Sequence, residues 1–189
     1  MADNYYKTKE SVNEYIRLAE GVNGGELIGK LNTFLPKDSK VLELGSGPGT
    51  DWKLLQKDYS VVGSDNSGQF LEHLEESNPM GKFLKLDAVS LDTNECYDGI
   101  YSNKVLHHLS DEELKESINN QLSRLNENGI VCHSFWNGKG SEYFKGLFVN
   151  YHSKDDLMGY FAASFEVLYL DFYQEFYKED SLLFVGRRK

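Results

Sequence analysis

The sequence predicts an α/β protein, with a doubly wound and mostly parallel sheet covered by helices on both faces. Short apolar runs alternate with amphipathic segments of helical periodicity along most of the 189 residues, and this alternation is typical of parallel sheets. A glycine-rich turn at residues 45–49 joins the first apolar run to a helical segment. The last two apolar runs, residues 165–172 and 182–185, have no helical pattern between them, so we expect them to pair as an antiparallel hairpin.

The helices are predicted from apolar residues spaced three or four positions apart and from residues that favour helix ends. Pro36 ends the second helix, and Thr50 or Asp51 can cap the third. Ser110 and Glu113 form a capping box that begins the fifth. The predicted helices span residues 10–19, 26–35, 50–59, 67–76, 110–127 and 153–163.

The strands are predicted from short apolar runs bounded by turn residues. Besides the final hairpin, the predicted strands are residues 40–44, 60–64, 82–86, 97–102 and 130–135. Asn128 and Gly129 are expected to form the turn between the fifth helix and the last of these strands. Residues 137–152 are the longest stretch without a periodic pattern, and we expect them to form a lid or substrate loop.

Length and composition predict one globular domain over residues 1–189, with residues 1–35 as an N-terminal helical cap. Hydrophobic residues make up 40% of the chain, which is enough for a sizeable core. The formal net charge is −10, and such a surface repels phosphate backbones and anionic lipid headgroups. We therefore expect neither nucleic acid nor a membrane as a partner, and the charge leaves open which small molecule or protein takes that place.

The sequence also indicates where the protein resides. No apolar run has the length of a membrane span, and the first residues lack a basic and then apolar signal segment, so a cytoplasmic protein is expected. Cys96 and Cys132 lie far apart in apolar runs, and we expect both to be buried, reduced thiols.

The glycine-rich turn carries the most specific signal. It follows the pattern Glu43-x-Gly45-x-Gly47-x-Gly49, and glycines at this density allow a tight turn and a close backbone approach to a ligand. A dinucleotide fingerprint requires a glycine at the sixth position counted from Gly45, where Thr50 stands. This spacing disfavours a nicotinamide-dependent oxidoreductase, which is one alternative for a sheet of this kind.

Polar residues close the next three strands, at the edge of the sheet where such proteins bind ligands. Asp65 follows the second strand and can accept hydrogen bonds from two ribose hydroxyls. Asp87 follows the third and can accept one from an exocyclic amine of adenine. Ser102 and Asn103 end the fourth and can hold an amino-acid group. An aspartate at such a position is often only a turn or helix cap, but two of them after the glycine turn favour a ligand site.

Four blocks of the sequence, in order and at familiar spacing, resemble the class I S-adenosylmethionine-dependent methyltransferases. These blocks are residues 41–49, 61–67, 83–88 and 97–109, and residues 124–130 are similar to the family's turn into its fifth strand. That turn usually reads Pro-Gly-Gly and here reads Glu127-Asn128-Gly129. The resemblance implies a seven-stranded mixed sheet with its last strand inserted antiparallel.

The resemblance also implies S-adenosylmethionine as the cofactor. Glu43 and the glycines would line its methionine end, Asp65 would bind the ribose, and Asp87 with Ala88 would meet the adenine. The residues expected to bind the cofactor are Glu43, Gly45, Ser46, Gly47, Gly49, Asp65, Asn66, Asp87, Ala88 and Asn103.

Methyl transfer from a sulfonium is an in-line displacement, so the protein mainly aligns donor and nucleophile and excludes water. A general base is needed only for a protonated acceptor. The candidates for this catalytic role are His107, His108 and His133, each of which could instead be a packing residue. Some relatives bind a metal through carboxylates after the fourth strand. Lys104 and His107 stand there in this sequence, so no metal is expected.

The sequence does not identify the methyl acceptor. Aromatic residues at the N-terminus and after the fifth strand can cover the cofactor and the acceptor, or can simply belong to the core; they are Tyr5, Tyr6, Tyr15, Phe135, Trp136, Tyr143, Phe144 and Tyr151, with His152. We expect a methyltransferase that acts as a monomer or homodimer on a small-molecule acceptor. The alternative is a module of the same fold that binds the cofactor or its demethylated product without turnover, or that serves as a partner subunit.

Overall fold

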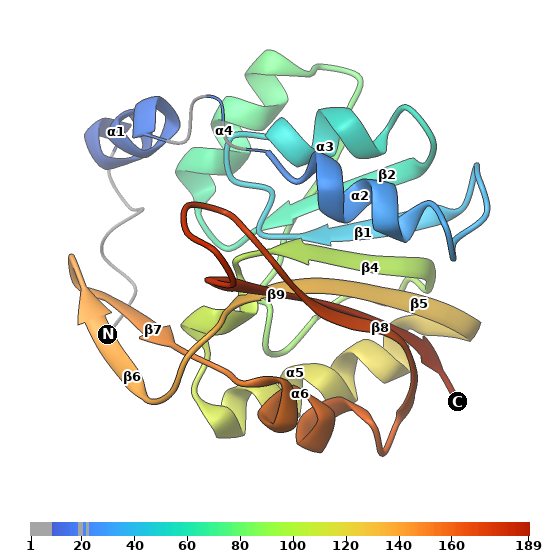
Figure 1. Ribbon diagram of the computed structural model, residues 1–189. Helices are drawn as coiled ribbons and strands as arrows, with labels where there is room; N and C mark the ends of the chain where they lie inside the picture. Colours follow the sequence, from blue (N-terminus) through green and yellow to red (C-terminus); the bar gives the residue numbers. More distant parts are fainter. Residues whose placement is uncertain (1–8, 19–20, 22) are drawn as a thin grey trace.

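The computed structural model of the protein describes residues 9–18, 21 and 23–189. Its strands are β1 (Lys40–Leu44), β2 (Ser60–Asp65), β3 (Lys82–Lys85), β4 (Tyr97–Asn103), β5 (Leu125–Trp136), β6 (Ser141–Phe144), β7 (Leu147–Asn150), β8 (Phe165–Tyr173) and β9 (Ser181–Arg188). Its helices are α1 (Lys9–Leu18), α2 (Gly25–Leu31), α3 (Thr50–Leu55), α4 (Gly68–Ser77), α5 (Asp111–Arg124) and α6 (Lys154–Phe161), with a short 3-10 helix, η1 (Leu106–His108), after β4. Figure 1 shows these elements in the colours of the sequence.

Seven of the strands form one sheet in the order β3-β2-β1-β4-β5-β9-β8. The neighbours from β3 to β5 pair in parallel, and β9 is antiparallel to both β5 and β8. The structure therefore confirms the mostly parallel seven-stranded sheet, the inserted antiparallel last strand and the C-terminal hairpin. Because β1 lies between β2 and β4, the connections that leave β1 and β4 run to opposite sides, which is the position where such sheets bind ligands.

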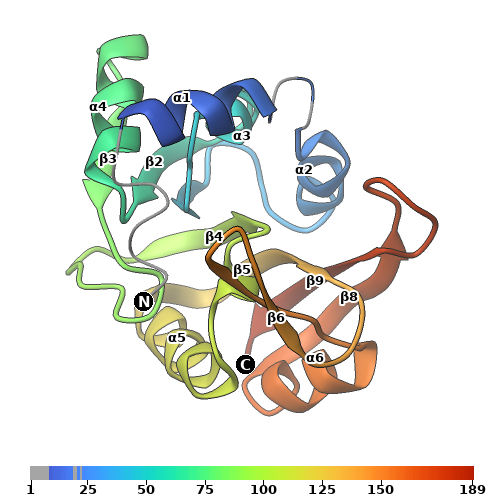
Figure 2. The same ribbon diagram turned by 90° about the vertical axis from the view of Figure 1, so that its left-hand side faces the viewer.

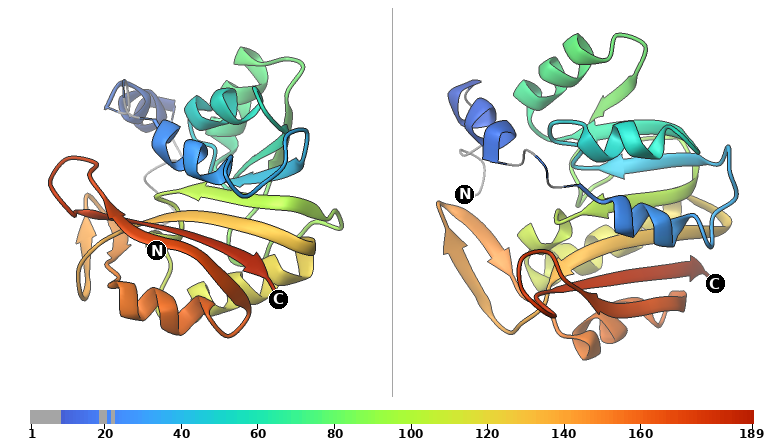
Figure 3. Two further views of the ribbon diagram at one scale, coloured as in Figure 1. Left: turned by 45° about the vertical axis from the view of Figure 1, so that its right-hand side comes forward. Right: turned by 45° about the horizontal axis from the view of Figure 1, so that its top comes forward.

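Helices cover both faces of the sheet, as predicted (Figures 1 and 3), and an apolar layer lies beneath the helices of each face. Alternate residues of β1 supply both layers, with Leu42 and Leu44 on one face and Val41 on the other. The layer under α5 and α6 includes the buried helix residues Leu114, Ile118, Leu157 and Phe161. The layer under α2 and α3 includes the buried helix residues Leu27, Leu31 and Leu55.

The stretch predicted as an irregular loop, residues 137–152, is instead built around a β-hairpin. Strands β6 and β7 pair antiparallel with Tyr143 opposite Phe148. Lys145 and Gly146 form the turn, both with positive φ (49° and 83°), as two-residue hairpin turns require. The prediction of irregular structure was wrong because this turn lacks the Asn-Gly or Asp-Gly pair that usually marks such hairpins. Figure 2 shows the hairpin at the same edge of the molecule as the end of β4.

Four predicted boundaries are also corrected. Helices α2 and α3 end at Leu31 and Leu55, because tighter turns follow, in which the N–H groups of Thr33, Phe34, Lys57 and Asp58 bond three residues back. Gly49, in the left-handed conformation, occupies the N-cap of α3 in place of Thr50 or Asp51. Strand β5 begins directly at Leu125 and includes the expected turn residues Asn128 and Gly129, because Leu125 already pairs with Tyr97 of β4.

The expectation for the thiols is confirmed for one cysteine only. Both Cys96 and Cys132 are free, and Cys132 is buried within β5. Cys96 is exposed because it lies just before β4, outside the sheet.

Candidate functional site

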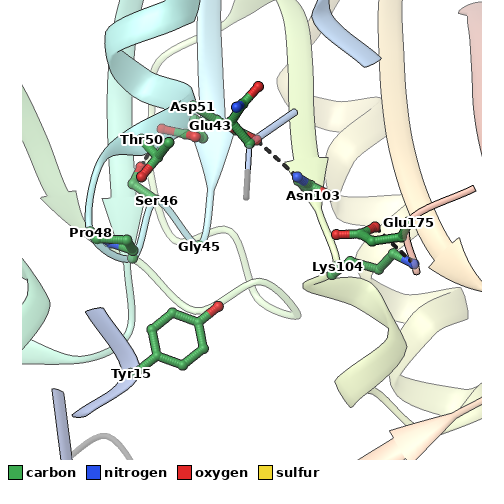
Figure 4. A pocket seen from close by; sticks show the side chains of 12 residues that line it. Tyr15, Glu43, Gly45, Ser46, Pro48, Thr50, Asp51, Asn103, Lys104 and Glu175 are labelled. Atoms are coloured by element: carbon green, nitrogen blue, oxygen red, sulfur yellow. Dashed lines mark hydrogen bonds and ion pairs between the residues drawn. The ribbon is translucent and has the colours of Figure 1, made fainter. Parts of the chain in front are cut away.

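A pocket opens at the carboxyl ends of β1 and β4 (Figure 4). One wall is the glycine loop after β1 and the start of α3, and the other is formed by the residues that end β4. Tyr15 of α1 and Glu175 of the loop between β8 and β9 complete it. Its lining residues are Tyr15, Asn23, Glu43, Gly45, Ser46, Gly47, Pro48, Thr50, Asp51, Asn103, Lys104 and Glu175. The pocket thus lies where the strand order predicts a ligand site.

The glycine loop adopts a conformation that side chains disfavour. Gly45, Gly47 and Gly49 all have positive φ, of 64°, 48° and 79°. A Cβ atom at Gly49 would lie 2.5 Å from Cδ2 of Leu74, so this glycine allows close packing. At Gly47 the nearest such atom is Cε1 of Tyr15 at 3.9 Å, so the backbone there is open to the pocket. Gly47 therefore offers the close backbone approach that a ligand of this site requires.

Glu43 and Ser46 form a buried pair behind the loop. The Ser46 hydroxyl donates to Oε2 of Glu43 over 2.6 Å, and the Ser46 N–H donates to the Ser64 carbonyl. Burial raises the pKa of Glu43 to about 8, against the effect of the Ser46 hydrogen bond. Glu43 therefore carries a proton at neutral pH and adds little negative charge to the pocket.

Asp65 fastens the glycine loop to the end of β2. Its Oδ2 accepts from the N–H of Gly47 over 2.9 Å, and its Oδ1 accepts from the N–H of Ser67 over 2.8 Å. Burial raises the pKa of Asp65, although these two hydrogen bonds act in the opposite direction. Each carboxylate oxygen can accept a further hydrogen bond, so the structure leaves acceptor capacity at Asp65 for hydroxyl groups.

Asn66 and the predicted adenine-binding residues Asp87 and Ala88 form a neighbouring group outside the pocket lining. Asn66 donates from its amide to Oδ2 of Asp87 over 3.1 Å. Oδ1 of Asp87 accepts from the N–H of Val89, and the Ala88 carbonyl accepts from the Ser117 hydroxyl. The structure thus brings Asn66 and Asp87 together at the ends of β2 and β3. Asn103 lies at the end of β4, on the other side of β1 and its glycine loop.

Asp51 is a central residue of the pocket that the sequence suggested only as a helix cap. Its Oδ1 accepts from the N–H of Gly24 over 2.6 Å. Its Oδ2 accepts from the Tyr101 hydroxyl over 2.7 Å and from the Asn103 amide over 3.0 Å. The Asn103 carbonyl oxygen accepts in turn from the Ser134 hydroxyl over 2.6 Å. This network fixes Asn103, a predicted cofactor residue, against both walls of the pocket.

Lys104 and Glu175 form an ion pair on the β4 side of the pocket. Nζ of Lys104 lies 3.4 Å from Oε2 of Glu175, and both side chains are largely buried. The same ammonium lies 3.2 Å from the ring centroid of Trp136, within the distance of a cation–π contact. Burial lowers the pKa of Lys104 to about 8, although Glu175 raises it. In the sequence, Lys104 indicated only that a metal is disfavoured, and no local pattern marked Glu175 as a site residue.

The three histidines suggested as general bases do not line the pocket. His133 is buried in the sheet, with Nδ1 2.8 Å from the Ser102 hydroxyl and Nε2 2.8 Å from the Gln121 side-chain oxygen. Burial lowers its pKa to about 3. His108 places Nδ1 2.7 Å from the carbonyl oxygen of Phe148 in the hairpin, and His107 is buried beside it with a pKa that burial lowers. The predicted catalytic role gains no support from this geometry.

Other sequence expectations have mixed outcomes. Of the proposed aromatic cover, Tyr15 lines the pocket, whereas Tyr5 and Tyr6 lie outside the described residues. Phe135 is fully buried in the core, and Tyr143 and Phe144 are exposed on the hairpin. Within the described ranges, no three His, Cys, Asp or Glu side chains are grouped to hold a metal ion. In the same ranges, no helix is long and apolar enough to cross a membrane.

Comparisons with known proteins find sequence similarity to methyltransferases. The family described as "Methyltransferase domain" matches residues 41–129, which run from β1 into the first residues of β5. A segment of 83 residues is 35% identical to trans-aconitate 2-methyltransferase of Variovorax paradoxus; it makes up 42% of this chain and spans only 32% of that enzyme.

Solved methyltransferase structures share the fold over nearly the whole chain. One is an S-adenosylmethionine-dependent methyltransferase from Clostridium acetobutylicum, with 12% identity, a TM-score of 0.77, and coverage of 93% of this chain and 98% of that one. Another is the 1,6-didemethyltoxoflavin-N1-methyltransferase of Burkholderia thailandensis with bound S-adenosylhomocysteine, with 16% identity, a TM-score of 0.77, and coverage of 93% and 82%. Residues 41–129 are thus similar to a methyltransferase domain, and the chain has the fold of these S-adenosylmethionine-dependent methyltransferases.

Proposed function

We propose that the chain is an S-adenosylmethionine-dependent methyltransferase that transfers a methyl group to a small molecule. The observation that carries this proposal is the open backbone at Gly47, which faces a pocket at the carboxyl ends of β1 and β4. The matched methyltransferase domain, residues 41–129, contains this loop together with Asp51, Asp65 and Asn103.

In this proposal each group of residues holds one part of the cofactor. The glycine loop, Asp51 and Asn103 receive the methionine end, Asp65 accepts from the ribose hydroxyls, and the Asp87 and Ala88 region meets the adenine. Asp51 supplies a negative charge for the cofactor's amino group. When bound, S-adenosylmethionine supplies an electrophilic methyl group on a positively charged sulfur. The chain's own task is to orient that methyl group toward the acceptor and to keep water out.

A small-molecule acceptor is supported by the relatives and by the charge of the chain. The toxoflavin precursor methyltransferase and trans-aconitate methyltransferase are both named for small acceptors. A net charge of −10 disfavours nucleic acid as a substrate. We also propose a single domain that acts in the cytoplasm as a monomer or homodimer, without a metal ion.

Calorimetric titration tests the cofactor assignment. We expect S-adenosylmethionine and S-adenosylhomocysteine to bind, and NAD to show no binding under the same conditions. Turnover is then measured as release of S-adenosylhomocysteine over a panel of amine, hydroxyl, thiol and carboxylate metabolites. Failure to bind either adenosyl compound would disprove the proposal. Tight binding without turnover on any acceptor would instead indicate the non-catalytic module.

A further inference from the structure

We propose that Glu175 binds the methyl acceptor through a hydrogen bond, and that the acceptor donates this bond from an N–H or O–H group rather than presenting a carboxylate. This inference rests on the proposed methyltransferase function. It concerns the side of the pocket opposite the glycine loop, where the ends of β4 and β5 meet the loop between β8 and β9.

The β8–β9 loop is held in a fixed conformation by one side chain. The carboxylate of Asp180 accepts from the backbone N–H groups of Glu175, Phe176 and Tyr177 over 2.9, 2.8 and 2.8 Å. Burial raises the pKa of Asp180, but the hydrogen bonds outweigh it and lower the pKa to about 2, so the carboxylate keeps its charge at physiological pH. The loop therefore presents Glu175 to the pocket from a preorganised turn.

An aromatic contact fixes the same loop to the end of β5. The ring of Phe176 stacks on that of Trp136, with centroids 6.0 Å apart and an interplanar angle of 22°. Trp136 also lies under the ammonium group of Lys104. The loop, β5 and the end of β4 thus form one continuous wall next to Glu175.

The two carboxylate oxygens of Glu175 have different surroundings. Oε2 accepts from the Tyr173 hydroxyl over 2.9 Å and pairs with Lys104. Oε1 has no hydrogen-bond partner among the described residues. Figure 4 shows the carboxylate between the side chains of Asn103 and Lys104, at the pocket lining. Oε1 is therefore an open hydrogen-bond acceptor with a negative charge, on a side chain that is otherwise 14% exposed.

The other polar groups on this side of the pocket are already engaged. Nζ of Lys104 has three acceptors for its three hydrogens: Oγ of Ser181 at 2.6 Å, the Phe135 carbonyl oxygen at 3.3 Å and Glu175. The Asn103 side chain is bound to Asp51 and Ser134. If the methyl acceptor presented a carboxylate, Glu175 would repel it. The carboxylate could bind Lys104 only by replacing one of the three partners that the ammonium group already has. A donor group gains a charge-assisted hydrogen bond instead.

The reaction balances with Glu175 as the recipient of the proton. A lone pair of the acceptor nitrogen or oxygen forms the bond to the methyl carbon. The bond between that carbon and sulfur breaks, its electrons remain on sulfur, and the sulfonium becomes a neutral thioether. The proton of the N–H or O–H group passes to Oε1 of Glu175 and then to solvent, so neither oxidant nor metal is required.

The experiment measures binding of three matched probes to the S-adenosylhomocysteine complex of the whole chain: benzylamine, benzyl alcohol and benzoate. We expect benzylamine, benzyl alcohol or both to bind at least tenfold more tightly than benzoate, and the two donor probes separate amine from hydroxyl acceptors. Glu175→Gln should lose this preference and keep its affinity for S-adenosylhomocysteine within about twofold. Glu179→Gln is the matched control on an exposed residue of the same loop and should behave as wild type.

A second variant tests whether the preference depends on Lys104, the ion-pair partner of Glu175. It also provides a measurement if Glu175→Gln fails to fold. Lys104→Met keeps a long unbranched side chain over Trp136 and should retain the preference for a donor probe. Benzoate binding equal to that of the donor probes, or a preference that survives Glu175→Gln, would overturn the inference while leaving the cofactor assignment intact. Loss of S-adenosylhomocysteine binding by the wild-type chain would remove the proposed function, and this inference with it.

Discussion

Asp51 joins three segments that are distant in the sequence. Its partners Gly24, Tyr101 and Asn103 lie 27, 50 and 52 residues away along the chain. A helix-start pattern predicts where Asp51 sits but not which donors folding brings to it, and the same limit applies to Glu175. The glycine loop was predictable because its spacing and its need for positive φ are local properties.

The central glycine of the loop gives the first prediction. Gly47→Ala places a methyl group at the open pocket and should reduce the affinity for S-adenosylhomocysteine by more than about tenfold, because the ligand loses its close backbone approach. Its backbone strain should cost roughly 1–2 kcal/mol of stability. Gly140→Ala is the matched control, since Gly140 also has positive φ (77°) and open space around it. Equal affinities by calorimetry in the two variants would refute the loop assignment.

Asp65 gives the second prediction. Asp65→Ala should weaken S-adenosylmethionine binding by about tenfold or more, because it removes a charged acceptor for the ribose and releases the N–H of Gly47. The exposed Asp92→Ala controls for the change in net charge. Unchanged calorimetric affinity in Asp65→Ala would rule out the ribose role.

Glu43 predicts a dependence of stability on pH. Its pKa is about 8 in the folded state and near 4.5 when unfolded. At a pH between these two pKa values, Glu43 is protonated in the folded state and deprotonated in the unfolded state. A rise in pH over this range therefore favours unfolding. The contribution of Glu43 to the free energy of unfolding is therefore complete below pH 4.5, and it decreases by about 1.4 kcal/mol per pH unit up to pH 8.

Glu43→Gln removes this titration and keeps an acceptor for the Ser46 hydroxyl. Relative to this variant, the wild type should lose stability from pH 5.5 to 7.5 in urea unfolding, whereas the exposed Glu72→Gln should follow the wild type. A constant difference between wild type and Glu43→Gln across this range would show that Glu43 is not a buried proton carrier.

Among the elements, those with strong local signals were predicted well. The capping box at Ser110 and the alternating pattern of the strands placed α5 and the sheet within a few residues. The β6–β7 hairpin was missed because its Lys145-Gly146 turn carries little sequence signal, both strands are short, and β6 is exposed along its whole length. The hairpin attaches to η1 through His108 and the Phe148 carbonyl, a contact between residues 40 positions apart.

The capping box also gives a prediction for the element it begins. Ser110 accepts from the Glu113 N–H, and Glu113 accepts from the Ser110 N–H. Ser110→Ala should lower the free energy of unfolding by about 1 kcal/mol, because one N–H at the start of α5 loses its partner. Exposed Ser90→Ala is the control and should change stability by much less. A Ser110→Ala variant as stable as wild type in urea unfolding would show that the cap contributes nothing.

For the whole molecule, the strand order explains why the site lies where it does. The strands β2 and β3 lie on one side of β1, and the strands from β4 to β8 lie on the other. The loops after β1 and β4 therefore border one pocket. The sequence could predict this order through the resemblance to a known family. It could not predict that the β8–β9 loop adds Glu175 to the pocket, because that contact depends on how the terminal hairpin docks at the far edge.

A crystal structure of the chain with S-adenosylhomocysteine tests the central claim most directly. The account predicts density for the homocysteine group between Gly47 and Asn103, with the ribose at Asp65 and the sulfur facing Glu175. Density for the compound at another surface, with the Gly47 pocket filled only by solvent, would contradict it.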